Sequence, residues 1–177
     1  MGHKYSRDEI LEGAVQAAVD HGLSSLTFGR LARRLGTSDR VIVYYFTTKN
    51  ALVTDVLVAI GVRLQEVLAG AFPDKAADHR QMVAAAYPVL ANSAVDPLFA
   101  VYFEACGLAA AHQAPFHEVA PQLMAAWVDW LADFFSGSRA RRTREAEATM
   151  ALVDGLLLMR HLAGPHAADR AARTLGL

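Results

Sequence analysis

Two pairs of apolar residues on either side of one glycine constrain this chain more than any other feature of its sequence. Leu31 and Leu35 are one helical turn apart, as are Ile42 and Phe46, and Gly36 stands between the two pairs. Residues four apart lie on the same face of a helix, so each pair predicts a short helix with an inward-facing side. Glycine adopts the left-handed conformation that ends a helix without steric cost. The spacing therefore predicts two short helices joined by a tight turn, a helix-turn-helix.

The second of these helices has an outward face of mixed chemistry. Thr37 or Ser38 is placed to cap its start. The residues that remain free outside its inward face are Asp39, Arg40, Val41, Val43 and Tyr44. Such a surface can hydrogen-bond to base edges and contact thymine methyl groups in the major groove of DNA. The segment therefore predicts a DNA-binding unit.

Positive charge is concentrated around this segment, although the whole chain has a formal net charge of −1. Residues 1–50 contain seven Lys and Arg against five Asp and Glu, a balance of +2. Residues 51–177 contain ten against thirteen, a balance of −3. A local excess of cations attracts a phosphate backbone and makes binding depend on salt. For Arg33 and Arg34, a solvated helix exterior explains the charge equally well.

The rest of the chain shows helical periodicity and helix-ending signals, without the alternation typical of strands. Ser6 and Glu9 form a capping box before apolar residues that repeat at helical spacing up to Gly22. Further helices are expected over residues 48–70, 78–94, 96–112, 115–135, 138–162 and 166–175. The expected fold is all-α. It has a three-helix, helix-turn-helix DNA-binding domain over residues 1–47 and a helical effector-binding and dimerisation domain over residues 48–177.

The cysteine content and the length of the apolar runs indicate the cellular compartment of the protein. Cys106 is the one cysteine, which excludes an intrachain disulfide and fits a reducing, cytoplasmic location. The longest apolar run, Leu156-Leu157-Leu158-Met159, is far shorter than the roughly 20 residues that a membrane-spanning helix needs. We therefore expect a cytoplasmic protein with no membrane partner.

A set of residues between about positions 6 and 57 carries a family resemblance. The set comprises His21-Gly22, Leu26-Thr27, Leu31-Ala32, Leu35-Gly36, Tyr45-Phe46 and Lys49-Asn50-Ala51-Leu52. This segment resembles the tetracycline-repressor (TetR) family of bacterial transcription regulators, from whose pattern it departs at Gly29, Val43 and Thr47. The resemblance implies a dimeric regulator, in the first instance a repressor, that binds a palindromic operator and is released from it by a small molecule.

The resemblance also implies roles for individual side chains. Arg40 would make a bidentate contact to guanine, unless Asp39 pairs with it, and Val43 would touch a thymine methyl. Tyr45 has a half-buried position in the core as its alternative role. The expected DNA-binding set is Thr27, Tyr44, Tyr45 and Lys49 toward phosphates, Asp39, Arg40, Val41 and Val43 toward bases, and Ser38.

Residues 150–162 predict a helix that is apolar on nearly every side, and such a helix has to be covered all round. One chain can cover one side, and a second copy is the natural cover for the other, with Gly155 permitting close approach. We therefore expect a homodimer whose interface contains Val153, Leu156, Leu157 and Met159. A buried central helix of a monomer is the alternative.

Aromatic residues of the body are candidates for the effector pocket that the resemblance implies. Small-molecule pockets are mostly apolar, with a few polar groups that orient the ligand, and Glu104 is one candidate for such a group. The expected ligand-binding residues are Tyr87, Phe99, Tyr102, Phe103, Cys106, Trp127 and Trp130. Core packing is the alternative for each of them. The expected effector is a small apolar or amphipathic molecule, and no cofactor or metal is expected.

Two other classes of function are alternatives to a sequence-specific regulator. A helical enzyme would use Cys106 with His112 and His117, together with Glu104 and Glu118, but a predicted helix break separates the two histidines. A nonspecific DNA-binding protein would show flat sequence preference together with steep salt dependence. The sequence favours a regulator that is not an enzyme.

Overall fold

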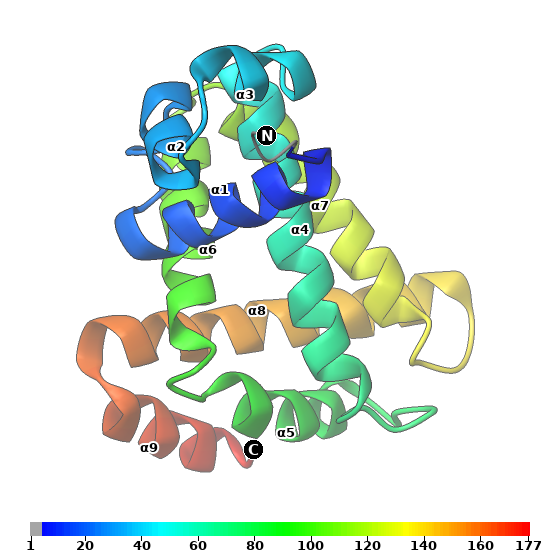
Figure 1. Ribbon diagram of the computed structural model, residues 1–177. Coiled ribbons are helices and arrows are strands. Elements are labelled where there is room, and N and C mark those ends of the chain that lie inside the picture. Colours follow the sequence, from blue (N-terminus) through cyan, green and yellow to red (C-terminus); the bar gives the residue numbers. More distant parts are fainter. Residues whose placement is uncertain (1–4) are drawn as a thin grey trace. The chain divides into compact units, whose positions relative to one another are not determined.

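A computed structural model describes residues 5–177, so residues 1–4 of the expected N-terminal domain lie outside the described part. Within that part the fold is all-α, as predicted, and an isolated bridge between Ala76 and Phe135 is its one β-type contact. No helix of residues 5–177 combines the length and apolar character needed to cross a bilayer. The helices, labelled in Figure 1, are α1 (Arg7–His21), α2 (Phe28–Leu35), α3 (Asp39–Tyr45), α4 (Lys49–Ala69), α5 (His79–Leu90), α6 (Asp96–Ala110), α7 (Phe116–Ala132), α8 (Arg139–Ala163) and α9 (Pro165–Leu175).

The helix ends follow from the local chemistry that the sequence predicts. Ser6 Oγ accepts a hydrogen bond from Glu9 N at 3.2 Å, while Glu9 Oε2 accepts one from Ser6 N at 2.7 Å. Gly36 ends α2 in the left-handed region, with a φ of 66°. Ser138 caps α8 by accepting from Arg141 N at 3.3 Å. The predicted capping box and glycine turn are therefore confirmed.

The chain forms two compact units, and each is discontinuous in sequence. Within the described part, the first contains residues 5–62 and 100–120, and the second contains residues 63–99 and 121–177. The expected boundary at residue 47 differs from this division, because α4, α6 and α7 are each long enough to contribute to both units.

The core of the first unit includes the inward faces of its first four helices. Arg7 of α1 forms an ion pair with Asp55 of α4, and its guanidinium carbon lies 5.0 Å from the centroid of the Phe46 ring. The fully buried side chains include Ile10, Val15, Leu31, Ile42 and Leu52. The inward faces predicted for the two short helices are thus present, with Leu35 half-buried.

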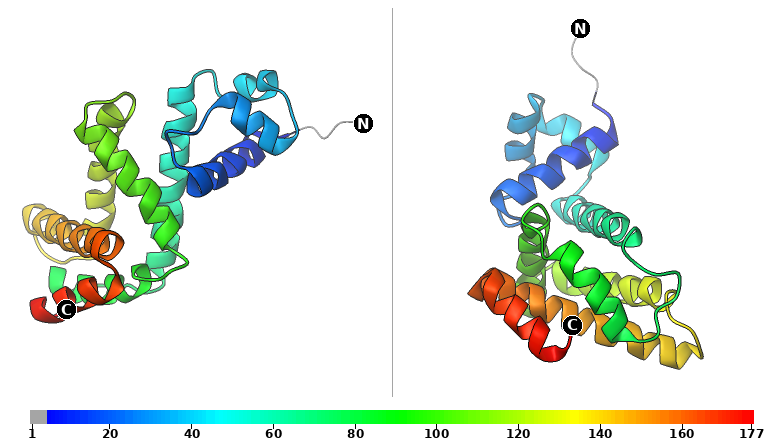
Figure 2. Two further views of the ribbon diagram at one scale, coloured as in Figure 1. Left: turned by 90° about the vertical axis from the view of Figure 1, so that its left-hand side faces the viewer. Right: turned by 90° about the horizontal axis from the view of Figure 1, so that it is seen from below.

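In the second unit, α8 packs against both α5 and α9, and the three helices lie close together in Figures 1 and 2. Arg160 of α8 makes two hydrogen bonds to Asp96 at the start of α6, at 2.8 and 3.0 Å. The bond from Arg160 holds the pKa of Asp96 below its usual range, against the opposing effect of burial. Arg80 of α5 donates to the carbonyl of Leu175 at 3.1 Å, so the C-terminal end lies beside α5.

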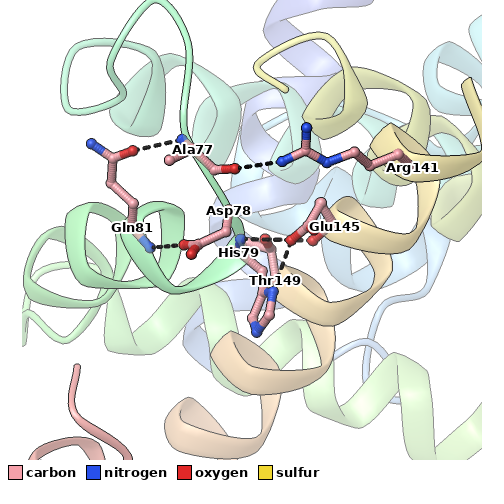
Figure 3. A network of polar contacts seen from close by, with 7 residues as sticks. All are labelled: Ala77, Asp78, His79, Gln81, Arg141, Glu145 and Thr149. Atoms are coloured by element: carbon pink, nitrogen blue, oxygen red, sulfur yellow. Dashed lines mark hydrogen bonds and ion pairs between the residues drawn. The ribbon is translucent and has the colours of Figure 1, made fainter. Parts of the chain in front are cut away.

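A polar network at the start of α5 fixes this helix on α8, as Figure 3 shows. Asp78 caps α5 by accepting from Gln81 N at 3.0 Å. Glu145 of α8 accepts from His79 N at 2.9 Å and lies 2.8 Å from His79 Nδ1. These contacts from the His79 side chain and backbone hold the pKa of Glu145 below its usual range. The first turn of α5 is therefore capped from two directions.

Candidate nucleic-acid interface

Helix α3, the second helix of the helix-turn-helix and hereafter the recognition helix, buries one side and exposes most of the residues predicted to read DNA. Ile42 is fully buried and Val41 is half-buried, whereas Tyr44 is 79% exposed. Ser38 occupies the N-cap position, although its side chain makes no capping hydrogen bond. The exposed residues of this segment are Ser38, Asp39, Arg40, Val43 and Tyr44. The helix therefore presents a continuous polar and apolar face to solvent.

Arg40 is the cation on this face. It has no hydrogen-bond or ion-pair partner among residues 5–177, so the pairing with Asp39 that the sequence left open is not formed. Asp39 instead faces α2, where a Cβ added to Gly29 would lie 3.5 Å from Asp39 Oδ2. A guanidinium has five N–H donors in a planar fork. Those of Arg40 are available to a base edge or a phosphate.

Tyr45 occupies a different position from that predicted for a phosphate contact. It is half-buried, and its hydroxyl donates to the carbonyl of Tyr5 at 2.8 Å. A phenol has one proton, and a phosphate oxygen requires a donor, so this bond excludes simultaneous donation to phosphate. The ring of Tyr45 stands edge-on to that of Tyr44, with centroids 4.9 Å apart. Tyr45 thus has the half-buried role that was its alternative, and it supports the exposed Tyr44.

Two helix starts place hydroxyl groups beside the recognition helix segment. Thr27 Oγ1 caps α2 by accepting from Arg30 N at 3.3 Å, and Thr48 Oγ1 accepts from Ala51 N at 3.1 Å at the start of α4. Both hydroxyls are exposed and keep their protons for donation. Lys49 follows Thr48 and is also exposed. Helix N-termini favour anions, so Thr48 joins the candidates as a residue that the predicted site omitted.

Glu104 of α6 binds the turn between α1 and α2 within the first unit. Its Oε2 accepts from Leu23 N at 2.7 Å, and its Oε1 accepts from Ser24 N at 2.9 Å and from Ser24 Oγ at 2.6 Å. Gly22 has a φ of +79°, and a Cβ added there would lie 2.8 Å from Glu104 Oε2. Burial raises the pKa of Glu104, but the hydrogen bonds from Ser24 and Leu23 outweigh it and hold the pKa below its usual range.

This position corrects the role that sequence reasoning gave to Glu104. It was a candidate for orienting a ligand in the effector pocket, yet both of its oxygens are engaged by the turn that precedes α2. Glu104 is 81 residues from Leu23 in the chain, so no local motif could reveal this contact. The carboxylate instead attaches α6 to the helices that carry the candidate DNA interface.

The residues expected in an effector pocket divide between the two units. Tyr87 and Phe99 are buried in the second unit, where the Tyr87 hydroxyl donates to Asp169 at 2.9 Å. Desolvation and this hydrogen bond raise the pKa of Tyr87 to about 12. Tyr102 and Phe103 belong to the first unit, are half-buried and have ring centroids 5.3 Å apart.

The tryptophans of α7 belong to an aromatic cluster of the second unit. The Trp127 ring stands edge-on to Trp130, with centroids 5.3 Å apart. Trp130 in turn packs against Phe72 and Phe134, at 5.6 and 5.2 Å between centroids, beside the buried core around Phe135. Trp130 therefore takes part in core packing, the alternative that the sequence left open for it.

The residues considered for an enzyme give a loose arrangement. The rings of His112 and His117 have centroids 6.4 Å apart, and Cys106 is exposed on α6. Glu118 Oε1 lies 3.7 Å from His117 Nε2. Within residues 5–177 no three His, Cys, Asp or Glu side chains are grouped to hold a metal ion.

The apolar side chains that α8 exposes are not the same set as those predicted for a dimer interface. Val153, Leu156 and Leu157 are 7%, 4% and 0% exposed, so they belong to the core of the second unit. Leu158 and Leu162 are 41% and 79% exposed, and Met159 is 41% exposed. These three side chains are therefore packed within their own chain, and the interface itself stays a prediction, because a sequence that is apolar all round a helix does not indicate which side its own chain covers.

A family comparison agrees with this geometry. Residues 10–56, which run from α1 into α4, match the family described as bacterial regulatory proteins, tetR family. No curated protein matched the sequence.

Solved structures share the fold over nearly the whole chain. A transcriptional regulator from Rhodococcus sp. Rha1 is 21% identical, with a TM-score of 0.72 over 95% of this chain and 92% of its own. A putative TetR-family regulator from Rhodococcus sp. is 19% identical, with a TM-score of 0.71 over 94% and 93%. A putative transcriptional regulator from Saccharomonospora viridis, in complex with choline, is 18% identical, with a TM-score of 0.66 over 96% and 93%. The helix-turn-helix segment thus matches the tetR family of bacterial regulatory proteins, and the whole chain shares its fold with these solved structures.

Proposed function

We propose that the protein regulates transcription by binding a specific DNA sequence through α3. The observation that carries this proposal is the exposed face of α3, on which the Arg40 guanidinium has no partner among the described residues. A guanidinium in the major groove makes a bidentate contact to the O6 and N7 of guanine, and Val43 is placed beside it for a thymine methyl. Asp39 and the half-buried Val41 complete the residues assigned to the bases, with Ser38 at the start of the helix.

The phosphate contacts come from the capped helix ends and the exposed tyrosine. The hydroxyls of Thr27 and Thr48 can donate to phosphate oxygens while they cap their helices, and Lys49 adds a charge at the start of α4. Tyr44 adds a third hydroxyl. We assign Tyr45 to positioning Tyr44, because its own proton is used in the bond to Tyr5.

We propose a homodimer formed through the outward row of α8. Ala151, Gly155, Leu158 and Leu162 are exposed and recur at helical spacing, so they form one apolar row, with Met159 beside it. A Cβ added to Gly155 would meet nothing within 4 Å, which leaves room for close approach of a partner helix. A two-fold dimer would place its recognition helices roughly 34–36 Å apart, or a multiple of that, on a palindromic site.

We propose that a small apolar or amphipathic effector releases the DNA. The supporting observation is the set of aromatic residues in the body, with Tyr87, Phe99, Trp127 and Trp130 in the second unit and Tyr102 and Phe103 in the first, where Cys106 follows them on α6. Helix α6 carries both Phe99 and Glu104, so a ligand that displaces α6 near Phe99 would alter the anchor on the turn before α2. Binding would thereby shift the population of DNA-competent conformations.

The test is selection of bound fragments from sheared genomic DNA, followed by titration of the best fragment against random DNA at one salt concentration. We expect a palindromic motif bound at least about a thousandfold more tightly than random DNA. Comparable affinity for all fragments would contradict specific reading and favour the nonspecific DNA-binding alternative.

Two variants separate the assigned roles. Arg40→Ala should reduce the preference for the best fragment by about 5- to 150-fold, because a lost bidentate contact costs about 1–3 kcal/mol of discrimination. Lys49→Ala should weaken binding to all sequences alike and lower the salt slope by about one. Equal losses on specific and random DNA for both variants would contradict the base-reading role of Arg40.

A further inference from the structure

A pocket of about 340 Å³ lies in the second unit, where α7 ends and α8 begins. This volume is near the lower limit of the roughly 300–1,000 Å³ that small-molecule sites occupy. Charged side chains form most of the lining, and its two carboxylates balance its two guanidinium groups. The lining residues are Asp129, Ala132 and Asp133 at the end of α7 and Arg139, Arg142 and Thr143 at the start of α8.

The backbone around this pocket is held by contacts that do not use the charged side chains of the lining. Lys75 Nζ donates to the carbonyl of Asp133 at 2.6 Å, and Ala76 N donates to the carbonyl of Phe134 at 2.8 Å. On the other side, Ser138 caps the start of α8. The end of α7 and the start of α8 are therefore fixed independently of how the lining charges pair.

The charged side chains of the lining pair only weakly with one another. Asp129 and Arg139 have no hydrogen-bond or ion-pair partner among residues 5–177. Arg142 Nη1 lies 3.4 Å from Asp133 Oδ1, and the Asp133 side chain is 81% exposed. The other edge of the Arg142 guanidinium, formed by Nε and Nη2, has no partner in the described part of the chain, although Nε is buried. A buried donor without an acceptor costs free energy, which a bound carboxylate would recover.

The two sides of the pocket have opposite charge. Both carboxylates belong to the α7 side, where the C-terminal end of a helix adds partial negative charge. Both guanidinium groups belong to the first turn of α8, where the N-terminal end of a helix adds partial positive charge. Side chains and helix ends therefore favour a cation on the α7 side and an anion on the α8 side.

We propose that this pocket binds a small zwitterion, a free α-amino acid. A ligand with a single charge meets both signs in the lining, whereas a zwitterion matches both sides. The ligand carboxylate accepts from the Nε and Nη2 edge of Arg142, in the two-bond geometry typical of guanidinium and carboxylate, and Arg139 adds a second positive charge. The ligand ammonium donates to Asp129 and Asp133. The pocket shares no residue with the candidate DNA interface or with the aromatic set, so the inference goes beyond the proposed function and does not depend on it.

The experiment compares amino acids with counterparts that carry only one of the two charges. The common α-amino acids are titrated into the full chain, without DNA, by isothermal titration calorimetry up to about 10 mM, a range that detects millimolar dissociation constants. The strongest binder is then compared with the acid that lacks its ammonium group and with the amine that lacks its carboxylate. For L-alanine these counterparts are propionate and ethylammonium.

We expect saturable binding of at least one amino acid, at one site per chain, at least about tenfold tighter than either counterpart, because each counterpart leaves one side of the pocket unmatched. Arg142→Gln and Arg139→Gln should remove the preference over the amine, and Asp129→Asn should remove the preference over the acid. Arg144→Gln and Asp74→Asn each remove an exposed charge outside the lining, and both should bind like the unmodified protein. Circular dichroism verifies the fold of each variant, and the exposed Arg139 and Asp129 suffice for the test if the half-buried Arg142 is needed for folding.

Three results would overturn the proposal. One is the absence of binding for every amino acid over the measured range. Another is a counterpart that binds as tightly as the amino acid, which would make the pocket a site for a simple anion or cation. The third is binding that Asp129→Asn and Arg139→Gln leave unchanged, which would place the ligand elsewhere in the protein. None of these measurements uses DNA, so a failure of the proposed function is seen separately.

Discussion

The exposed face of α3 and the helices of the second unit differ in whether their polar side chains have partners within the chain. On α3, Arg40 has no partner within the described residues. In the second unit, Arg160 bonds twice to Asp96 and the Tyr87 hydroxyl bonds to Asp169. A polar group with internal partners contributes to the stability of the fold, whereas one without them is available to another molecule. The contrast separates residues that hold the protein together from residues that we propose contact DNA.

The largest effect should come from the buried side of α8. Leu157→Ala removes a side chain that is 0% exposed, and it should lower the free energy of unfolding by about 2–5 kcal/mol. Leu162→Ala, at a residue that is 79% exposed, should leave the fold of the single chain intact and weaken self-association. Denaturant unfolding at one protein concentration and analytical ultracentrifugation measure the two effects. A similar loss of stability in both variants would contradict the division of α8 into an inner and an outer side.

The second-largest loss of stability should come from breaking the ion pair between Arg160 and Asp96 in the second unit. Asp96→Asn leaves the Arg160 guanidinium, whose side chain is 10% exposed, without its negative partner. The free energy of unfolding should fall by about 1.5–3 kcal/mol, the contribution of hydrogen bonds to a charged group, because the Asp96 side chain is 33% exposed. Asp20→Asn is the matched control, because it disrupts the pair with Arg34, whose side chains are 38% and 43% exposed, and should cost at most about 1 kcal/mol. Equal losses in urea unfolding would show that burial does not distinguish these pairs.

Substitution of Glu104 tests whether the first unit also contains a polar side chain whose partners within the chain stabilise the fold. Glu104→Gln should cost about 1–3 kcal/mol at neutral pH, since the amide cannot accept all the bonds of the carboxylate. The pKa of Glu104 in the folded protein is below its usual value of 4.5, so its contribution is complete above that pH and is lost as the pH falls through the lowered pKa.

The measurement for Glu104 is unfolding between neutral and acidic pH, with hydrogen exchange of the Leu23 and Ser24 amides. Acidification should destabilise the unmodified protein more than the variant, and the two amides should exchange faster in the variant. Unchanged exchange at both amides would indicate that Glu104 does not hold the turn.

The smallest effect should come from one hydroxyl. Tyr87→Phe should cost about 0.5–1.5 kcal/mol, the contribution of one hydrogen bond. The pKa of Tyr87 is raised from 10.0 to about 12, so the stability associated with its neutral form is present below pH 10.0 and is lost as the pH rises through about 12. Tyr87→Phe should remove this alkaline loss, which unfolding measured above pH 9 can follow. Tyr44→Phe, at an exposed residue, is the matched control and should leave the free energy of unfolding at neutral pH unchanged.

Local signals in the sequence were sufficient for the helices and for the recognition segment. The capping box of Ser6 and the left-handed Gly36 act on residues within one turn of themselves, so their effects are visible in the sequence. The same holds for the cap at Ser138 and for the exposed side of α3, which follows once Ile42 is placed inside.

Contacts between distant parts of the chain were not predictable. The bonds of Glu104 to Leu23 and Ser24 cross about 80 residues, and those of Arg160 to Asp96 cross 64. The bond from Tyr45 to the carbonyl of Tyr5 likewise depends on where the start of α1 lies. In α8, the apolar residues cover every side, so their spacing contains no information on which of them face α5 and α9.

The anchor at Glu104 limits how parts of regulators can be exchanged. A chimera that joins residues 1–47 to the body of another regulator would replace α6 and lose the carboxylate. The backbone N–H groups of Leu23 and Ser24 would then lack their acceptor beside a Gly22 that keeps its positive φ. A graft that transfers residues 100–120 together with residues 1–62 would move the helix-turn-helix and its Glu104 anchor as one unit.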